Sequence, residues 1–503
     1  MVSPRVCLSA IALAPMCAVA QLGPLPDDGR LTARVTLSHP VATIETLLDD
    51  LSNRTGVRLT ADASVKEDLI VLRVKNVAAR EVMERVASHF DWSWRAEDGG
   101  YVLFQSKEQK EREQKAYAEQ LLLPLQRSQE AMRKWLPSIE RDFEQNRARL
   151  REARERFRQV SPPNPEWGEL YDEVERLEGI ATPVALYTAR LFLSINDEQY
   201  EQMIERGCLV FALTPTAAQW RVPQGLRDQA REVAADLGLD TTGVTSFEVI
   251  VAFSHNEDSI YSAESLPVDH ADIAVLDSSG RVVATQTVFL PDVFLNNVGQ
   301  RVIPHSDDRL RGRIIRSEAF DELVATGWPG TRRRLASESL AYLARGSNVP
   351  PMRGYGRLAV LVADALDLNL LADAHALWGP PSEALRMREA DILVGGLFRD
   401  TWQLEDGWIN ARSSTWAVYR RHAVRVGRLR AVRDNYLASG GLSVGALAQY
   451  GREFSFFNLL DPFFSLTLDG TTEAPWAAAA TKFFGTLTPA QLAHLAAGDA
   501  LPA

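Results

Sequence analysis

The chain has 503 residues and a formal net charge of −11, and its 46% hydrophobic and 24% charged residues are ordinary for a globular protein of several domains. Its 31 glycines and 25 prolines exclude a collagen-like or wholly disordered chain, and its three cysteines exclude a disulfide scaffold. The negative charge argues against a nucleic-acid partner, because phosphate binding favours a basic surface.

The first twenty residues predict a secretory signal peptide. A short segment with Arg5 precedes an apolar stretch at 6–15, and the small residues at 18–20 form a cleavage signature. We therefore expect the mature chain to begin at Gln21 and to reside in the periplasm or against the outer membrane. Cys208 would then be its single cysteine, which rules out an internal disulfide. No later stretch offers the ~18 uninterrupted apolar residues of a membrane helix.

Residues 21–106 predict a small module of β-α-β-β-α-β-β order. Alternating or branched apolar residues indicate the strands, apolar residues at helical spacing indicate the helices, and Asp-Gly-Gly indicates a hairpin turn. The expected elements are a strand at 32–38 that ends at His39-Pro40, a helix that carries Ile44, Leu47, Leu48 and Leu51 and ends at Gly56, strands at 57–60 and 69–74, a helix capped by Asn76, and a hairpin of 92–96 and 101–105.

Parts of this module are similar to one known family. The segment TGVRL at 55–59, the strand 71–77 that leads into a helix, and the closing hairpin resemble the short N-terminal (STN) domain of secretins and TonB-dependent receptors. The resemblance implies a periplasmic protein–protein interaction module without catalytic residues. A partner strand could add to an edge of its sheet, and we expect that edge at 69–74 or 101–105. The alternative is that the module packs on the rest of the chain.

A second, degenerate copy of this unit is predicted at 351–415. The segment 59–63 (LTADA) recurs as LLADA at 370–374, and 94–99 (WRAEDG) recurs as WQLEDG at 402–407. Between them, Val86 and Phe90 match Val394 and Phe398, with a three-residue deletion that a loop can absorb. Chance similarity is the alternative. In either case the order of helix, strand, helix and hairpin predicts a second α+β unit.

Residues 107–162 predict a charged helical spacer. Good helix formers fill the region, and Pro124 and Pro137 interrupt the pattern, so we expect two or three exposed helices. Such a spacer would let the N-terminal module reach a partner while the rest of the chain is docked elsewhere. The arginines between 147 and 158 could attract an anionic polymer, but Glu152 and Glu155 among them favour ion pairs on a solvated helix.

Residues 163–350 predict a mixed α+β region. The expected elements are strands at 185–194 and 247–253, a helix at 197–206, a hairpin of 271–276 and 281–289 with its turn at 277–280, and a helix that starts at Leu213-Thr214-Pro215. Seven side chains of metal-binding type lie here, but no metal-binding motif organises them, so we expect no metal site. They are His255, Asp258, His270, Asp272, His305, Asp307 and Asp308.

Residues 416–503 predict a helical C-terminal region whose last helix starts at Leu487-Thr488-Pro489. The segment 441–445 (GLSVG) fits the nucleophile elbow of serine hydrolases, but an elbow needs a preceding strand and 429–437 reads as a helix. We therefore expect Ser443 to cap a helix, with a periplasmic hydrolase that uses Ser443 as the alternative. His422 and Asp434 lie too near Ser443 in sequence to match the chain order of that class.

Two further patterns in this region allow a binding role. The basic run 420–430 predicts either contact with an anionic cell-wall polymer or a helix paired with acidic neighbours, and we favour the second. A group of phenylalanines is expected in the core, with a partner surface as the alternative. These are Phe454, Phe456, Phe457, Phe463 and Phe464.

Together these patterns predict a multi-domain α+β protein that is exported and has no enzyme activity. We expect it to bind neither cofactor nor metal and to act through contacts with other envelope proteins, with association to the cell wall or outer membrane. Beyond the STN-like module the chain resembles large bacterial envelope proteins. A periplasmic serine hydrolase and a binder of an anionic wall polymer are the alternatives.

Overall fold

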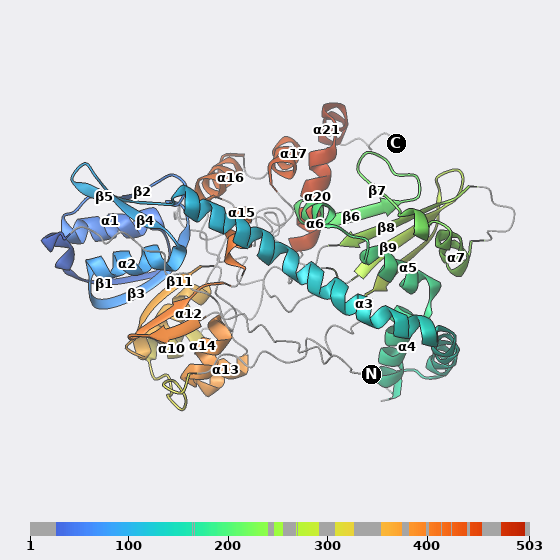
Figure 1. Cartoon of the computed structure of the whole chain (residues 1–503), viewed down its shortest axis with the longest axis horizontal. Coiled ribbons are helices and arrows are strands. Elements are labelled where there is room, and N and C mark those ends of the chain that lie inside the picture. Colours follow the sequence, from blue (N-terminus) through green and yellow to red (C-terminus); the bar gives the residue numbers. More distant parts are fainter. Residues whose placement is uncertain are drawn as a thin grey trace, which may run out of the picture.

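The computed structural model describes residues 27–162, 164, 166–239, 246–254, 268, 270–290, 307–325, 354–374, 382–398, 402–413, 415–423, 425–439, 443–454 and 474–497. Figure 1 shows two lobes that lie at opposite ends of one long helix. Both lobes combine helices with sheets, which confirms the predicted multi-domain α+β class.

The N-terminal lobe begins with the predicted β-α-β-β-α-β-β order. Its elements are η1 (Gly29–Thr32), β1 (Arg34–Thr43), α1 (Ile44–Thr55), β2 (Leu59–Ala61), β3 (Leu69–Ala78), α2 (Ala79–Phe90), β4 (Ser93–Glu97) and β5 (Gly100–Phe104). The hydroxyl of Thr43 caps α1. Gly56 ends the helix with a left-handed φ of 68°, which confirms the predicted stop at that residue.

Two details of that prediction are wrong. Asn76 does not cap a helix but lies inside β3, where its backbone N–H donates to the Thr36 hydroxyl at 3.0 Å. Strand β1 does not end at Pro40, because β1 is an edge strand and a register shift between His39 and Ala42 accommodates the proline. Both residues therefore lie inside strands that are longer than the sequence predicts.

The second unit completes the sheet of the first. Its elements are α10 (Glu318–Ala325), α12 (Gly354–Ala365), β11 (Asn369–Asp373), α13 (Ser382–Met387), α14 (Ala390–Phe398), β12 (Trp402–Glu405) and β13 (Trp408–Ala411). Five strands form the order β1-β3-β11-β13-β12, while β2-β5-β4 form a separate sheet. Strands β3 and β5 therefore have neighbours on both sides. The expectation of a free edge at 69–74 or 101–105 is wrong, because the chain's own strands cover both.

Within each of the two units, the strands pair at equivalent residues. Leu59 of β2 pairs with Tyr101 of β5, and the matching residue Leu370 of β11 pairs with Ile409 of β13. The antiparallel hairpins match in the same way, since Trp94 pairs with Leu103. Its counterpart Trp402 pairs with Ala411, and both hairpins turn through an Asp-Gly pair with positive φ. The internal repeat seen in the sequence therefore corresponds to a repeated three-strand arrangement.

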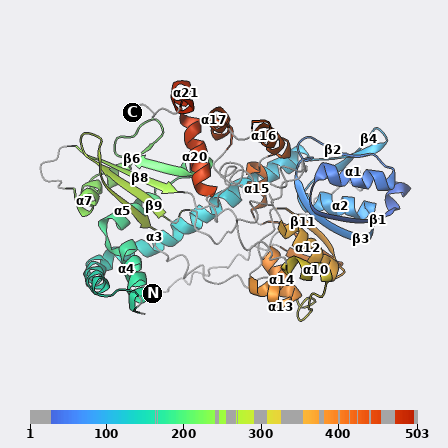
Figure 2. The same cartoon turned by 180° about the vertical axis from the view of Figure 1, so that it is seen from behind.

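One continuous helix replaces the predicted two or three. Helix α3 (Lys107–Gln159) has 53 residues and contains both Pro124 and Pro137. A proline inside a helix costs about 3 kcal/mol, but the apolar face of α3 is buried on the lobes through Leu121, Leu125 and Met132. The helix is thus part of the core rather than an exposed spacer, and Figures 1 and 2 both show it running from one lobe to the other.

The arginines near the end of α3 are paired across to the next helix. Helix α4 (Glu166–Ala181) packs against α3, with ion pairs from Arg149 to Glu173 and from Arg154 to Glu178. The expected pairing within one helix is found at Glu155, which binds Arg158 at 3.2 Å. Arg156 also pairs with Glu166 of α4, so half of the six arginines are neutralised by α4, a partner that the sequence did not identify.

The second lobe is built around the sheet β10-β9-β8-β6-β7. Its elements are α5 (Pro183–Phe192), α6 (Asp197–Arg206), β6 (Cys208–Ala212), β7 (Trp220–Arg221), η2 (Gln224–Leu226), α7 (Gln229–Asp236), β8 (Glu248–Ser254), β9 (His270–Leu276) and β10 (Val282–Phe289). The predicted helix at 197–206, the strand at 247–253 and the hairpin at 277–280 are confirmed.

Two predictions in this lobe are wrong. The segment 185–194 is not a strand but helix α5, because Thr182 caps it and Pro183 occupies its first position. Thr214 starts no helix, since its backbone N–H donates to Glu248 at 2.8 Å and holds the segment against β8. The same Thr-Pro pattern therefore starts a helix at 182 but not at 214.

The C-terminal region is helical where the structure describes it. Its elements are α15 (Trp416–His422), α16 (Val426–Ser439), α17 (Val444–Glu453), α20 (Ala474–Thr486) and α21 (Pro489–Ala496). A capping box of Thr488 and Gln491 starts α21 as predicted. Among the described residues, no helix combines the length and the apolar character that crossing a bilayer requires.

Candidate functional site: the Arg420 junction

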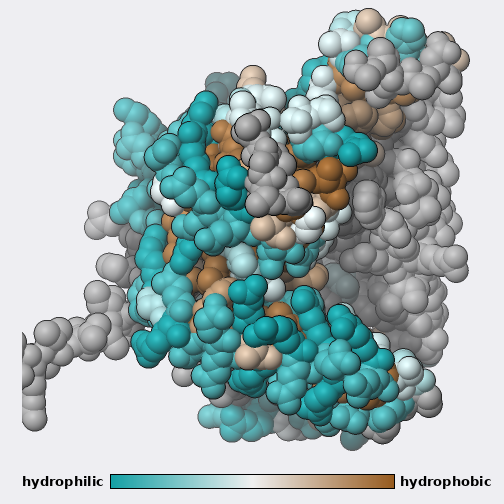
Figure 3. Space-filling view, turned by 90° about the vertical axis from the view of Figure 1, so that its right-hand side faces the viewer, coloured by the Kyte–Doolittle hydropathy of each residue, from teal (hydrophilic) through white to brown (hydrophobic). Residues whose placement is uncertain are grey.

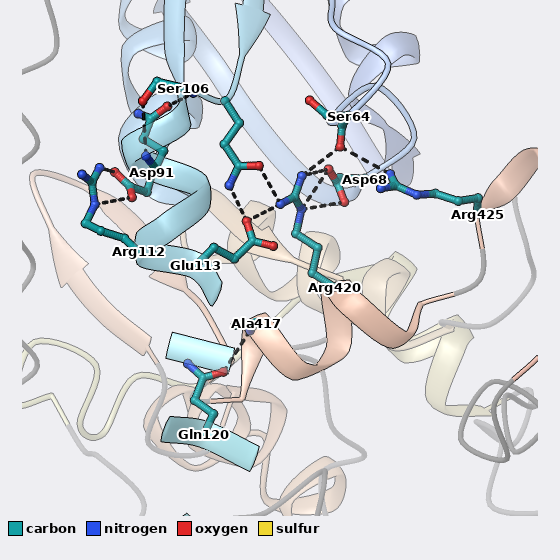
Figure 4. A network of polar contacts seen from close by, with 12 residues as sticks. Ser64, Asp68, Asp91, Ser106, Arg112, Glu113, Gln120, Ala417, Arg420 and Arg425 are labelled. Atoms are coloured by element: carbon teal, nitrogen blue, oxygen red, sulfur yellow. Dashed lines mark hydrogen bonds and ion pairs between the residues drawn. The ribbon is translucent and has the colours of Figure 1, made fainter. Parts of the chain in front are cut away.

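The basic run contributes one arginine to the interior. Arg420 lies on α15, directly after the second unit, and its side chain is 7% exposed. Figure 4 shows its guanidinium pointing between the loop that precedes β3 and the first turns of α3. Three segments that are distant in sequence therefore meet at one side chain, which we call the Arg420 junction: Arg420, Asp68, Glu113, Gln105 and the Ser64 carbonyl.

All three guanidinium nitrogens of Arg420 donate hydrogen bonds. Nε and Nη2 donate to the two carboxylate oxygens of Asp68, each at 3.1 Å, and Nη2 also donates to the Ser64 carbonyl at 2.9 Å. Nη1 donates to Gln105 Oε1 at 3.2 Å and forms an ion pair with Glu113. The planar fork of arginine suits this arrangement, because it offers donors in several fixed directions.

Polar and aromatic groups complete the junction. Gln105 Nε2 donates to the same Glu113 carboxylate, so the amide links the two sides of the network. The Arg420 guanidinium lies 5.4 Å from the ring of Trp92 and 5.5 Å from that of Trp416. One helical turn earlier, the backbone N–H of Ala417 donates to Gln120 of α3 at 2.9 Å. These contacts hold α15 against both the N-terminal module and α3.

The charges at the junction are set by burial and by each other. Burial raises the pKa of the Asp68 carboxyl above its ordinary value, and Arg420 offsets part of that effect. Burial lowers the pKa of Arg420, but Asp68 and Glu113 together outweigh burial and raise it. One cation thus faces two carboxylates, and its positive charge is required to keep both in the interior.

The junction has the properties of a positioning site. Every nitrogen of the guanidinium already has a partner within the chain, and the surrounding groups are 14% exposed at Asp68 and 18% exposed at Glu113. A group arranged in this way fixes the relative placement of the segments it joins. The groups of the junction come from the N-terminal module, from α3 and from α15, so the junction holds these three parts together.

The other described arginines of the basic run also have partners. Arg421 lies 4.3 Å from the Tyr117 ring, Arg425 donates to the Ser64 carbonyl at 3.4 Å, and Arg428 forms an ion pair with Glu453. The prediction that this run pairs with acidic neighbours is confirmed for Arg420 and Arg428. The run therefore does not present these two charges unpaired to an anionic polymer.

Ser443 caps a helix, as predicted. Its hydroxyl accepts a hydrogen bond from the backbone N–H of Ala446 at 3.2 Å at the start of α17, and the preceding described element is helix α16. The strand-to-helix turn of a nucleophile elbow is thus absent around Ser443 in the described residues. Gly441 lies outside them. His422 faces Tyr117, with 3.2 Å between Nε2 and the phenol oxygen, and burial lowers the pKa of His422 to about 4.

The residues of metal-binding type are only partly covered by the structure. His255, Asp258 and His305 lie outside the described residues, as do four of the five phenylalanines, Phe456, Phe457, Phe463 and Phe464. Within the described part of the chain, no three His, Cys, Asp or Glu side chains gather as metal ligands. Asp307 pairs with Arg309, Asp308 pairs with Arg311, and Phe454 is buried.

Sequence reasoning missed the acidic half of the junction. Asp68 and Glu113 are 352 and 307 residues away from Arg420, and neither belongs to a motif. The available signal was the basic run at 420–430, which predicted acidic partners without identifying them. Comparisons with protein families, with curated proteins and with solved structures find no match to this chain.

Proposed function

We propose that this is an exported, non-enzymatic cell-envelope protein that acts through contacts with other proteins. The signal-peptide pattern at 1–20 and the resemblance of 31–106 to the STN family support the location and the mode of action. The architecture supports a rigid form of that role. The two α+β lobes lie at the ends of α3, whose 53 residues span about 80 Å at 1.5 Å per residue.

The observation that carries this proposal is the Arg420 junction. A spacer that lets a module reach a distant partner would leave the module free to move, but here the junction ties the module to α3 and to α15. The hydrophobic core also supports a fixed module, because it is continuous from the N-terminal module along α3 into the second lobe. A continuous core and a buried ion-pair network both favour fixed geometry over tethered reach.

The experiment is affinity capture of the full chain from the envelope of its native host. A tagged wild-type chain should fractionate outside the cytoplasm, begin at Gln21, and retain the same envelope proteins in repeated captures. Arg420→Met should lose them, because the module is no longer fixed on α3. Arg428→Met removes an arginine from an exposed ion pair and is the matched control, which should retain them.

Two results would contradict the proposal. The first is a chain that remains in the cytoplasm with Met1 in place. The second is an exported chain that captures nothing, or whose captured proteins are unaffected by Arg420→Met in protein shown to have lost the junction.

A further inference from the structure

Strand β10 forms one edge of the second lobe's sheet among the described residues, and several of its side chains are exposed. Strand β10 has the sequence VVATQTVF and contains no charged residue, proline or glycine. Val282, Val283 and Phe289 are 53%, 39% and 55% exposed. In Figure 3, the coloured surface at this end of the molecule is mostly hydrophilic, with hydrophobic areas between the polar side chains.

The other edge strands of the described sheets are short or protected. Strands β2, β7 and β12 have three, two and four residues. Strand β4 carries Arg95 and Glu97, and β1 contains Pro40. Charges, prolines and short length are the usual means of preventing edge-to-edge pairing. Strand β10 has eight residues and lacks all of these protections.

The central part of β10 is a regular strand that could pair with a further strand at its outer edge. A register shift with β9 is confined to the first residues, between Val282 and Ala284, and the following residues pair one to one through Phe289. Ala284 and Val288 lie on the face that packs on the core, while Thr285 lies on the opposite face. Helix α4 approaches β10 at its end, where Gly179 lies beside the Phe289 carbonyl.

We propose that β10 pairs with β10 of a second copy of this chain, antiparallel, about a two-fold axis at Gln286. A two-fold axis perpendicular to the sheet keeps each face on its own side, so pairing must centre on a residue. With Gln286 at the centre, Thr285 lies opposite Thr287 of the second copy. On the inner face, Ala284 lies opposite Val288.

This register brings compatible side chains together across the seam, with identical residues at its centre. Gln286 meets Gln286 at the axis, the threonines form hydroxyl pairs, and Phe289 lies beside the exposed Val283 at each end. Thr–Thr and aromatic–β-branched pairs are among the stabilising cross-strand combinations. A strand whose own sequence provides these pairs under two-fold symmetry fits a second copy, and the pairing covers both free edges at once.

The test is sedimentation velocity of the chain from Gln21 onward over a range of concentrations. We expect a reversible dimer whose dissociation constant rises at least tenfold in Thr285→Lys, because two-fold symmetry places a lysine in the seam twice. Thr216→Lys makes the same change at an exposed threonine away from β10 and should leave the constant unchanged. A monomer at every concentration, or a dimer that Thr285→Lys leaves intact, would overturn the proposal.

Cross-linking tests the register separately. In a chain from Gln21 onward that carries Cys208→Ala and so has no other cysteine, Gln286→Cys should form a disulfide or a short thiol cross-link between copies, because position 286 faces itself. Thr285→Cys should cross-link far less alone and readily when mixed with Thr287→Cys. Equal self-linking at 285 and 286 would show that the strands do not pair as proposed.

Discussion

Replacing Arg420 with methionine should separate the N-terminal module from α3. Methionine preserves much of the side-chain length and apolar volume, so the change removes the charge and the donors rather than the packing. Asp68 and Glu113 would remain 14% and 18% exposed, facing each other without a cation. Their protonation or hydration would relieve part of the repulsion, and this relief requires the junction to open.

The expected loss in unfolding free energy is about 3–5 kcal/mol, the usual cost of removing one partner from a buried ion pair. The individual hydrogen bonds of Arg420 would sum to more, but the effects of neighbouring groups in one network are not additive. Because the penalty arises from two unpaired carboxylates, the triple variant Arg420→Met, Asp68→Asn, Glu113→Gln should recover most of the loss. Arg428→Met, in an exposed pair, should cost under about 1 kcal/mol.

Hydrogen exchange measured by peptide resolves this prediction within a chain of several domains. Exchange should accelerate in β3 and in the first turns of α3, while β8 and β9 of the second lobe provide an internal reference that stays protected. A loss in Arg420→Met as small as that in Arg428→Met would refute the reasoning. So would a triple variant that is no more stable than the single one.

Three further changes have defined outcomes. Ser443→Ala should cost about 1 kcal/mol in a thermal unfolding curve and leave the fold intact, because the lost group is a helix cap; covalent labelling of Ser443 by a serine-reactive probe would contradict this. Burial lowers the pKa of His89 to about 3 and that of His422 to about 4, so both stay neutral in the fold and gain protons on unfolding. The contribution of these two histidines to the unfolding free energy should therefore be present at pH 7.5, above their ordinary pKa, and about 3 kcal/mol of it should be lost by pH 5.5. A flat profile would show that the rings are accessible. Gly451→Ala should disrupt the α17–α20 contact, since its Cβ would lie 2.0 Å from the Thr481 carbonyl oxygen. The Cβ of Gly445→Ala on the same helix would meet only the Ser443 hydroxyl, at 3.9 Å, so this change should be neutral or stabilising. Equal melting temperatures for the two variants would refute the packing argument.

Local signals in the sequence predict the elements of the N-terminal module well. The helix stop at Gly56 and the turn at Asp98-Gly99 depend on backbone conformations that few residues adopt, so they can be read without knowledge of the fold. The internal repeat is also found in the structure, because its tryptophan and Asp-Gly pair occupy equivalent positions in the two hairpins. These features are determined by residues that are near one another in the chain.

Features that depend on distant packing could not be predicted in the same way. Pro124 and Pro137 argue for breaks in α3, and the helix continues because its apolar face is buried on both lobes. Strand β3 reads as a free edge until β11, about 300 residues later, is placed beside it. The Arg420 junction also depends on distant packing, since only folding brings Asp68 and Glu113 next to Arg420.

The central claim is that the N-terminal module is fixed on α3 as one rigid frame, and a distance distribution between the two tests it most directly. Cysteines for spin labels replace the exposed Glu84 on α2 and Glu144 on α3, in a chain from Gln21 onward that carries Cys208→Ala. Double electron–electron resonance between the two labels reports on this geometry. The account predicts one narrow distance distribution in the wild-type background and a broad one after Arg420→Met. A distribution that is already broad with Arg420 in place would show that the module moves freely on a tether and would contradict the account.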